Sequence, residues 1–275
     1  MIRARIASVT ASCAACCLTT YVILARLADA SVPDALHLMG LWPIGLPESL
    51  RAVYLTSLLF AGPLFLYLVV DAGWRDWLSS PTSPGPLRDL WTEWTAWRNY
   101  VAGPVTEEVL FRTASVPLML IARATLKETI FLSPVIFGLA HVHHFYEFRL
   151  SYPRVPATAA LLRSVFQFSF TTLFGAYATF LFVRTGSLLA VCAVHALCNS
   201  MGLPKVWGRV EPPAAVQEGQ GQGEQQRRAS VLWTVAYYVI LVAGAVLFYN
   251  NLWSLTESPG GNALVPSEAF GRRVA

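Results

Sequence analysis

Charged residues are scarce in this sequence. They make up 13% of its 275 residues, whereas 55% of the residues are hydrophobic, and the mean hydropathy is +0.50. A typical soluble domain carries about 25% charged residues. The few polar side chains present could not cover the surface of a soluble fold, so we expect lipid to be the main solvent. The length fits one domain, and we expect residues 1–275 to form a single integral-membrane domain.

Several motifs of metal-binding and nucleic-acid-binding proteins are also missing. The sequence has no HExxH zinc motif and no paired CxxC motif. Its five cysteines, an odd number, all lie in apolar segments, which argues against a disulfide framework. The net charge of +4 is dispersed and forms no basic stripe with interleaved aromatic residues. We therefore expect no nucleic-acid partner.

Long apolar runs, in contrast, are abundant. A membrane-spanning helix needs about 20 mostly apolar residues, and every span must be helical because lipid cannot satisfy free backbone groups. The sequence therefore predicts an all-α, polytopic transmembrane bundle with seven spans, or eight if a long segment is broken. The predicted spans are residues 6–27, 52–70, 101–123, 129–148, 158–183, 187–203 and 230–253.

Polar segments flank these runs. Residues 74–100 combine five tryptophans with charges, so we expect them to lie at the headgroup level, with an amphipathic helix near 87–99. Residues 210–229 are rich in Gln and Gly and predict a disordered loop. The first run exceeds the core of a signal peptide, which is about 7–15 residues long, and we expect it to be retained.

Ionisable side chains interrupt three of the apolar runs, where they are costly and indicate function. In the first, Pro104 suits the first turn of a helix, and Glu107 and Glu108 follow within that turn. Glu108 and Arg112 stand four residues apart and are expected to pair on one helix face. Glu107 is turned about 100° away and is expected to face a cavity. The alternative is that all three charges only hold helices together.

The second group contains Phe137 and His141, one helical turn apart, and then His143 and His144. Pro134 and the preceding serine resemble the start of a helix. A single histidine here would more often be a hydrogen-bonded core residue. Three histidines within four positions favour chemistry, although the last two could lie at the membrane surface.

The third group is His195 and Asn199, which stand four residues apart and point into the same space. Ser187 can cap the start of their helix, and Gly202 and Pro204 mark its end. The alternative is an interhelical hydrogen-bonding pair, which is common in membrane bundles.

A carboxylate, two imidazoles and a carboxamide suit attack of water on an amide. Glu107 can take a proton from water and His141 can share that role, while His195 and Asn199 can donate hydrogen bonds to an oxyanion. Other interpretations are a catalytic zinc held by Glu107, His141 and His195, or a proton-linked transporter or scaffold. A nucleophilic Cys192 or Cys198 is disfavoured, because no basic group obviously activates either thiol.

These residues resemble a known family. The patterns Glu-Glu-x-x-x-Arg (107–112), Phe-x-x-x-His (137–141) and His-x-x-x-Asn (195–199) occur in order. They are similar to those of the type II CAAX prenyl endopeptidases, within the wider family of CAAX proteases and bacteriocin-processing enzymes. The flanking residues 138–144 and 195–204 look like the eukaryotic branch. The resemblance covers about residues 100–205, which would be the catalytic core.

The resemblance implies an endopeptidase that removes the C-terminal tripeptide of farnesylated or geranylgeranylated CaaX proteins, such as Ras-like proteins. It implies a site in the endoplasmic reticulum membrane that is reached from the cytosol, and a glutamate-type mechanism with no required metal or cofactor. Glu107 and His141 would activate water, and His195 and Asn199 would form the oxyanion hole. Glu108, Arg112 and Phe137 would support them.

Overall fold

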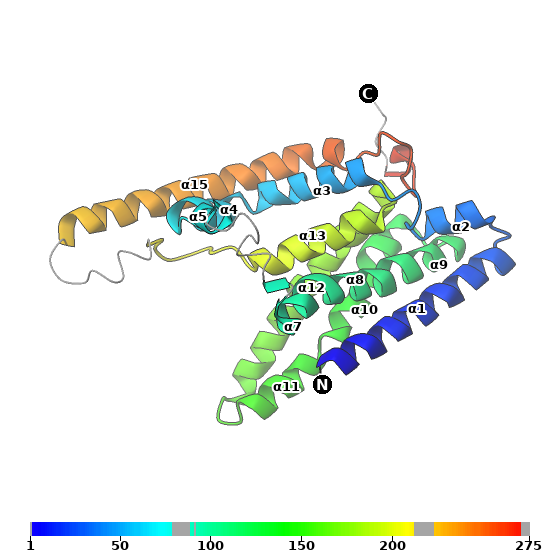
Figure 1. Cartoon of the computed structure of the whole chain (residues 1–275), viewed down its shortest axis with the longest axis horizontal. Helices are drawn as coiled ribbons and strands as arrows, with labels where there is room; N and C mark the ends of the chain where they lie inside the picture. The colour runs from blue at the N-terminus through cyan, green and yellow to red at the C-terminus, as the bar shows by residue number, and fades with distance from the viewer. Residues whose placement is uncertain (1, 79–88, 91, 212–222, 271–275) are drawn as a thin grey trace. The chain divides into compact units, whose positions relative to one another are not determined.

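The structure is a computed structural model that describes residues 2–78, 89–90, 92–211 and 223–270 (Figure 1). Within these ranges the regular structure is helical, with no strand, which confirms the predicted all-α fold. The chain forms two compact units. The first unit comprises Met1–Ile6, Leu50–Pro104 and Ala193–Thr256, and the second comprises Ala7–Ser49, Val105–Cys192 and Glu257–Ala275.

The described residues form α-helices, π-helical turns and one 3₁₀ turn. The α-helices are α1 (Ile2–Leu27), α2 (Val32–Leu38), α3 (Leu46–Leu59), α4 (Ala61–Phe65), α5 (Trp74–Leu78), α7 (Trp94–Trp97), α8 (Gly103–Glu108), α9 (Ser115–Ile121), α10 (Ser133–Ala140), α11 (His143–Ser151), α12 (Ala157–Thr185), α13 (Leu188–Met201) and α15 (Gly223–Leu255). The π-helical turns are η1 (Leu66–Val70), η2 (Arg98–Ala102), η3 (Val109–Ala114) and η4 (Glu128–Leu132), and η5 (Ser267–Phe270) is a 3₁₀ turn.

The predicted count of seven or eight spans is not confirmed. Three helices among the described residues are long and apolar enough to cross a membrane: α1, α12 and residues Val231–Leu255 of α15. The second predicted span is present as α3 followed by α4 and η1, but the two parts bend by 81° and count at most as one broken span. The third and fourth predicted spans are divided into shorter α and π pieces.

In the first unit, α15 packs along α4. Gly244 permits this close approach, because an added Cβ would overlap Cβ of Ala61 in α4 and the carbonyl oxygen of Leu58 at the end of α3. The buried Tyr237 accepts a hydrogen bond from the backbone N–H of Lys205 (2.9 Å), and Thr234 accepts one from Val210 (2.9 Å). These bonds attach the segment after α13 to α15. Of the predicted disordered loop, residues 223–229 belong to α15, and residues 212–222 lie outside the described residues.

In the second unit, α10 packs against α12. Gly138 permits this contact, because a Cβ at that position would overlap Oγ1 of Thr172. The helix α1 is attached to the same unit by two bonds to backbone carbonyls, from Cys13 Sγ to Thr106 (3.3 Å) and from Thr20 Oγ1 to Ala114 (3.2 Å).

The C-terminal segment also belongs to the second unit and is not free of contacts. The buried carboxylate of Glu48 accepts hydrogen bonds from Ser258 Oγ (2.7 Å) and from Asn262 Nδ2 (3.1 Å). Arg184 donates to Ser267 Oγ (2.6 Å). These side-chain bonds hold the described part of the C-terminal segment, through Phe270, in place.

The expected helix starts at Pro104 and Ser133 are wrong. Residues 94–121 and 126–140 are each continuously helical, so both prolines lie inside a helical run. Each proline follows a π turn: the N–H of Gly103 bonds to the carbonyl of Arg98, and that of Ser133 bonds to the carbonyl of Glu128. A π turn widens the helix and is one way to accommodate a residue that has no N–H.

Candidate active site

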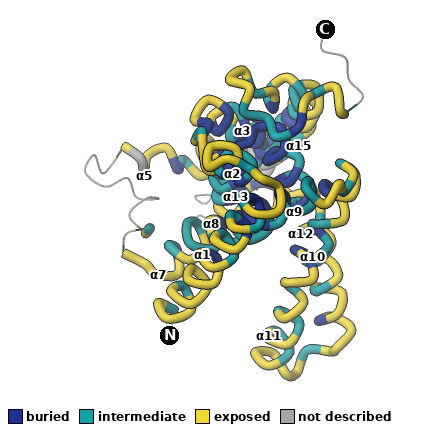
Figure 2. Tube along the Cα trace, turned by 90° about the vertical axis from the view of Figure 1, so that its right-hand side faces the viewer, coloured by how far each residue is buried: buried dark blue, intermediate teal, exposed yellow. Residues whose placement is uncertain are grey.

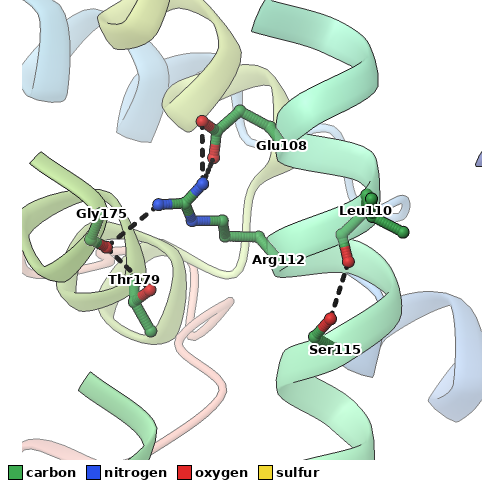
Figure 3. A network of polar contacts seen from close by, with 6 residues as sticks. All are labelled: Glu108, Leu110, Arg112, Ser115, Gly175 and Thr179. Carbon is green, nitrogen blue, oxygen red and sulfur yellow. Dashed lines mark hydrogen bonds and ion pairs between the residues drawn. The ribbon is translucent and has the colours of Figure 1, made fainter. Parts of the chain in front are cut away.

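The pair Glu108 and Arg112 is buried, as the four-residue spacing predicted. Arg112 Nη1 lies 3.0 Å from Oε1 and 2.9 Å from Oε2 of Glu108, and the two side chains are 1% and 0% exposed. Nη2 donates to the carbonyl of Gly175 on α12 (3.0 Å), which also accepts from Thr179 Oγ1 (2.9 Å) (Figure 3). Arg112 therefore connects η3 to α12, and its charge is balanced by Glu108.

Phe137 lies between this ion pair and His141. Its buried ring is 5.0 Å from Cζ of Arg112 and meets the rings of Phe111 (4.9 Å) and His141 (4.8 Å) edge-on. The supporting position expected for Phe137 thus has a geometric basis. An arginine over an aromatic face is attractive, and a packed ring beside His141 restricts how that imidazole can turn.

His141 is the residue that follows α10. Its Nδ1 lies 2.8 Å from the carbonyl oxygen of Phe137. A carbonyl only accepts, so Nδ1 carries the proton in this bond and Nε2 is the nitrogen with a free lone pair. The side chain is half-buried, so a water molecule has access to it. A neutral imidazole with Nε2 unprotonated can act as a base.

Glu107 is half-buried on α8, beside the fully buried Glu108. Phe111, one turn further along, contacts Phe137 on α10, and residues four apart share roughly one helix face. Glu107 is therefore on the side of its helix that faces α10, while Glu108 is committed to Arg112. The pairing of Glu108 with Arg112 agrees with the sequence analysis, and a cavity in front of Glu107 stays a prediction.

Gly175 on α12 allows close packing around the Glu108–Arg112 ion pair. A Cβ at Gly175 would lie 2.8 Å from Cβ of Pro134, 3.2 Å from Phe137 and 3.4 Å from Arg112. The contact with Pro134 is too close for a side chain at position 175, so even an alanine would force α10 and α12 to shift near Phe137, which packs against His141. The sequence analysis did not select Gly175, since a glycine inside a long apolar helix carries no signal of its partner.

The helix α13 carries His195 and Asn199 in the first unit. Its boundaries confirm the expected caps: the N–H of Ala190 donates to Ser187 Oγ (3.1 Å), and Gly202 has φ +64° and donates its N–H to the carbonyl of Cys198 (2.9 Å). His195 is 5% exposed, whereas Asn199 is exposed.

Asn199 is held by a backbone carbonyl of the same unit. Its Nδ2 donates to the carbonyl of Asn99 in η2 (2.9 Å). In the π turn, the N–H of Gly103 donates to the carbonyl of Arg98, five residues earlier. The same pattern would have the N–H of residue 104 donate to the carbonyl of Asn99. Residue 104 is a proline and has no N–H. Asn199 supplies the donor that Pro104 lacks. A carboxamide has two N–H groups, so one remains to act elsewhere.

Pro134 likewise leaves a backbone carbonyl without the N–H donor that the π pattern would supply. Continuing the π turn η4, the residue after Ser133 would bond to the carbonyl of Thr129, and that residue is Pro134. The hydroxyl of Ser133 donates to this carbonyl instead (2.9 Å). The two prolines differ in the donor that replaces the missing N–H. At Pro134 the donor is the adjacent Ser133, whereas at Pro104 it is Asn199, which is distant in the sequence. Asn99, whose carbonyl accepts this bond, is therefore a functional candidate that the sequence analysis missed.

The predicted catalytic residues are divided between the two units. Glu107 and His141 belong to the second unit and His195 and Asn199 to the first. Their convergence on one water molecule stays a prediction. Together they would provide two proton acceptors and two donors, which is what hydrolysis of an amide requires.

Comparisons with known proteins agree with the motifs. The family model of the Type II CAAX prenyl endopeptidase Rce1-like proteins matches residues 89–201, a range that contains all of the candidate residues. A probable CAAX prenyl protease 2 of Schizosaccharomyces pombe is 34% identical over 257 residues, covering 94% of this chain and 81% of that protein.

Other relatives are similar over shorter ranges. The CAAX prenyl protease 2 of Arabidopsis thaliana is 35% identical over 71% of this chain and 68% of its own length. That of Homo sapiens is 38% identical over 65% of this chain and 54% of its own length. No solved structure matches the chain. The long match to the fission-yeast protein and the family match over the motifs lead to one conclusion: the chain belongs to the type II CAAX prenyl endopeptidases, which are helical membrane proteases.

Proposed function

We propose that this chain removes the C-terminal tripeptide from farnesylated or geranylgeranylated CaaX proteins, including Ras-like proteins, at the endoplasmic reticulum membrane. The observation that carries the proposal is the 34% identity to a probable CAAX prenyl protease 2 over 94% of the chain. The substrate's prenyl group partitions into lipid, gaining about 0.8 kcal/mol per buried CH₂. The peptide bond to be cleaved is then already at the membrane surface, and we propose that it reaches the site from the cytosol.

In the proposed mechanism, Glu107 takes a proton from water, and His141 orients the water or shares the proton through Nε2. The resulting hydroxide attacks the carbonyl carbon of the prenylated cysteine, and the C–N bond between this carbon and the first residue of the tripeptide then breaks. His195 and Asn199 donate hydrogen bonds to the oxyanion, and the proton is passed to the leaving amine. Each oxyanion donor contributes about 2.7–4 kcal/mol in soluble proteases.

The activity can be tested with the full chain in liposomes. A farnesylated CaaX peptide is added, and the released tripeptide is quantified by mass spectrometry. We expect release by the wild-type chain, and no release by Glu107→Ala, His141→Ala or His195→Ala. Matched controls are Glu268→Ala and His37→Ala, which change the same residue types elsewhere in the chain.

Two results of this experiment would contradict the proposal. Full activity of Glu107→Ala, with the controls also active, would reject the assigned mechanism. No tripeptide release by a correctly folded wild-type chain, together with uptake of a solute into the liposomes, would instead favour a transporter.

A further inference from the structure

Three metal-ligating side chains gather on α11, outside the residues proposed to activate water. His143, His144 and Glu147 each offer one ligand atom, and these atoms lie within 4.8 Å of one another. This is the one such group of three that the described part of the chain contains. No residue of α11 is buried (Figure 2), so a hydrated cation can reach the group.

The bonding of His143 leaves its second ring nitrogen available. Nδ1 lies 2.7 Å from the carbonyl oxygen of Ala140, the last residue of α10. Because a carbonyl can only accept, Nδ1 is the protonated nitrogen and Nε2 carries the lone pair. Metal-ligating histidines usually hold their other ring N–H in such a bond, which fixes the tautomer and the ring orientation. His143 is thus already arranged as a ligand.

His144 and Glu147 complete the group from the same helix. His144 Nδ1 lies 2.7 Å from a carboxylate oxygen of Glu147, and the two side chains are 38% and 58% exposed. The rings of His143 and His144 are 4.0 Å apart. Ligand atoms about 2.0–2.2 Å from a zinc ion lie about 3–4 Å from one another. Small rotations of these partly exposed side chains would bring the three atoms into that range.

We propose that His143, His144 and Glu147 form a binding site for a divalent first-row transition cation, with Zn²⁺ as the best match. Imidazole nitrogen suits Zn²⁺, Cu²⁺ and Ni²⁺, whereas Mg²⁺ and Ca²⁺ prefer oxygen. Two histidines and one glutamate are a known zinc ligand set, with water in the fourth position. The site differs from the catalytic zinc considered above, because it uses neither Glu107 nor His195 and needs no residue of the first unit.

The site is also close to the proposed catalytic histidine. The rings of His141 and His144 are 5.9 Å apart, and only Val142 separates His141 from α11. A cation bound at His144 would therefore fix the turn that carries His141. The binding itself does not rest on the proposed function and can be measured without any substrate.

The test uses the full chain in nanodiscs, stripped of metal with a chelator and titrated with Co²⁺, whose visible absorption reports coordination by nitrogen and oxygen ligands. We expect one saturable Co²⁺ site from which Zn²⁺ displaces the ion. His143→Ala and Glu147→Ala should each weaken binding by more than about ten-fold, because losing even an outer-shell partner costs about 10- to 100-fold. His37→Ala is the matched control and should bind normally.

A second comparison separates the two possible metal sites. Glu107→Ala should bind Co²⁺ as the wild-type chain does if α11 holds the ion. Loss of binding in Glu107→Ala with retention in His143→Ala would overturn the proposal in favour of a metal among the catalytic residues. Absence of saturable binding would also overturn it and would leave His144 and Glu147 as a surface ion pair.

Discussion

Two adjacent glutamates have different environments in this chain. Glu108 is fully buried against Arg112, whereas Glu107 beside it is half-buried. An ion pair of this kind is weak evidence for stability by itself, but removing one partner leaves an uncompensated buried charge. The two side chains should therefore respond differently to the same substitution.

We predict that Glu107→Gln abolishes tripeptide release and leaves the thermal unfolding temperature nearly unchanged. Glu108→Gln should instead destabilise the chain, by up to about 3–5 kcal/mol, because Arg112 loses its counter-charge. Tripeptide release and thermal unfolding in nanodiscs measure the two effects. If Glu108→Gln were as stable as the wild-type chain and only inactive, the structural role of the pair would be wrong.

Pro104 acts at the residue scale through a missing N–H. Because Pro104 cannot donate, the carbonyl of Asn99 accepts a hydrogen bond from Nδ2 of Asn199 instead. In Pro104→Ala the new N–H can bond to Asn99 and compete with Asn199, which would then lose its fixed orientation. We predict a lower kcat for Pro104→Ala, though less reduced than in Asn199→Ala, where one donor is lost at a cost of about 10²–10³ in rate. Asn199→Ala should retain some turnover, since His195 still donates.

The double variant makes this prediction specific. If Pro104 acts only through Asn199, then Pro104→Ala should reduce kcat no further in an Asn199→Ala background, since the two changes remove one interaction. Independent, additive losses in the two single variants would mean that Pro104 affects the site in another way.

At the scale of elements, the helix that leads to His141 starts with a capping box. Glu128 N–H donates to Thr125 Oγ1 (3.2 Å), and the carboxylate of Glu128 accepts from the N–H of Thr125 (2.7 Å) and from its hydroxyl (2.9 Å). These hydrogen bonds, the backbone one first, lower the pKa of Glu128. The pattern Thr-x-x-Glu was visible in the sequence, but the sequence analysis placed the helix start at Ser133.

We predict that Thr125→Ala lowers the thermal unfolding temperature at neutral pH, since losing an N-cap costs about 1 kcal/mol. Because the folded pKa of Glu128 is lowered, its stabilising contribution is present above the usual glutamate pKa and is lost as the pH falls through the folded value. The difference between Thr125→Ala and the wild-type chain should shrink with acidification. A difference that grows at low pH would contradict this assignment.

The sequence predicted complete helices better than it predicted breaks. The fifth predicted span and the short sixth span match α12 and α13 closely, because each has an uninterrupted apolar run and a glycine with positive φ at its end, Gly186 and Gly202. The 81° bend before α4 and the four π turns were not predicted. Such breaks depend on which distant groups accept the freed backbone bonds, and hydropathy contains no information about those partners.

In the candidate site too, the sequence predicted the contact within one helix but not the partners from distant segments. Four-residue spacing correctly paired Glu108 with Arg112, because that contact lies within one helix. The partner carbonyls at Gly175 and Asn99 come from sequence positions 63 and 100 residues away and carry no local signal. The catalytic roles of Glu107, His141, His195 and Asn199 remain predictions from their chemistry and from the family resemblance.

At the scale of the whole molecule, lipid delivers the proposed substrate. A geranyl chain has five carbons fewer than a farnesyl chain, and each buried CH₂ contributes about 0.8 kcal/mol to membrane binding. We therefore predict that a geranylated CaaX peptide raises the apparent KM strongly and changes kcat much less. The measurement is initial rates of tripeptide release in liposomes at constant lipid. Equal KM values for the two peptides would contradict delivery through the bilayer.

Metal removal tests the whole catalytic account. We predict that a chelator leaves tripeptide release intact, because the proposed proton acceptors are Glu107 and His141 themselves. The same treatment should empty the cation site on α11, which gives an internal check that the metal was removed. Loss of cleavage on chelation, restored by Zn²⁺ in the His143→Ala variant, would favour the zinc-dependent mechanism.

The central claim is that side chains from three segments distant in the sequence share one water molecule and one substrate carbonyl. The most direct measurement is an experimental structure of the chain in a nanodisc, bound to a farnesylated CaaX peptide with a non-hydrolysable amide replacement. We predict the Glu107 carboxylate and His141 Nε2 within about 3 Å of one ordered water, with His195 and Asn199 donating to the carbonyl analogue. Side chains separated by more than about 10 Å, too far for one water to bridge, would contradict the account.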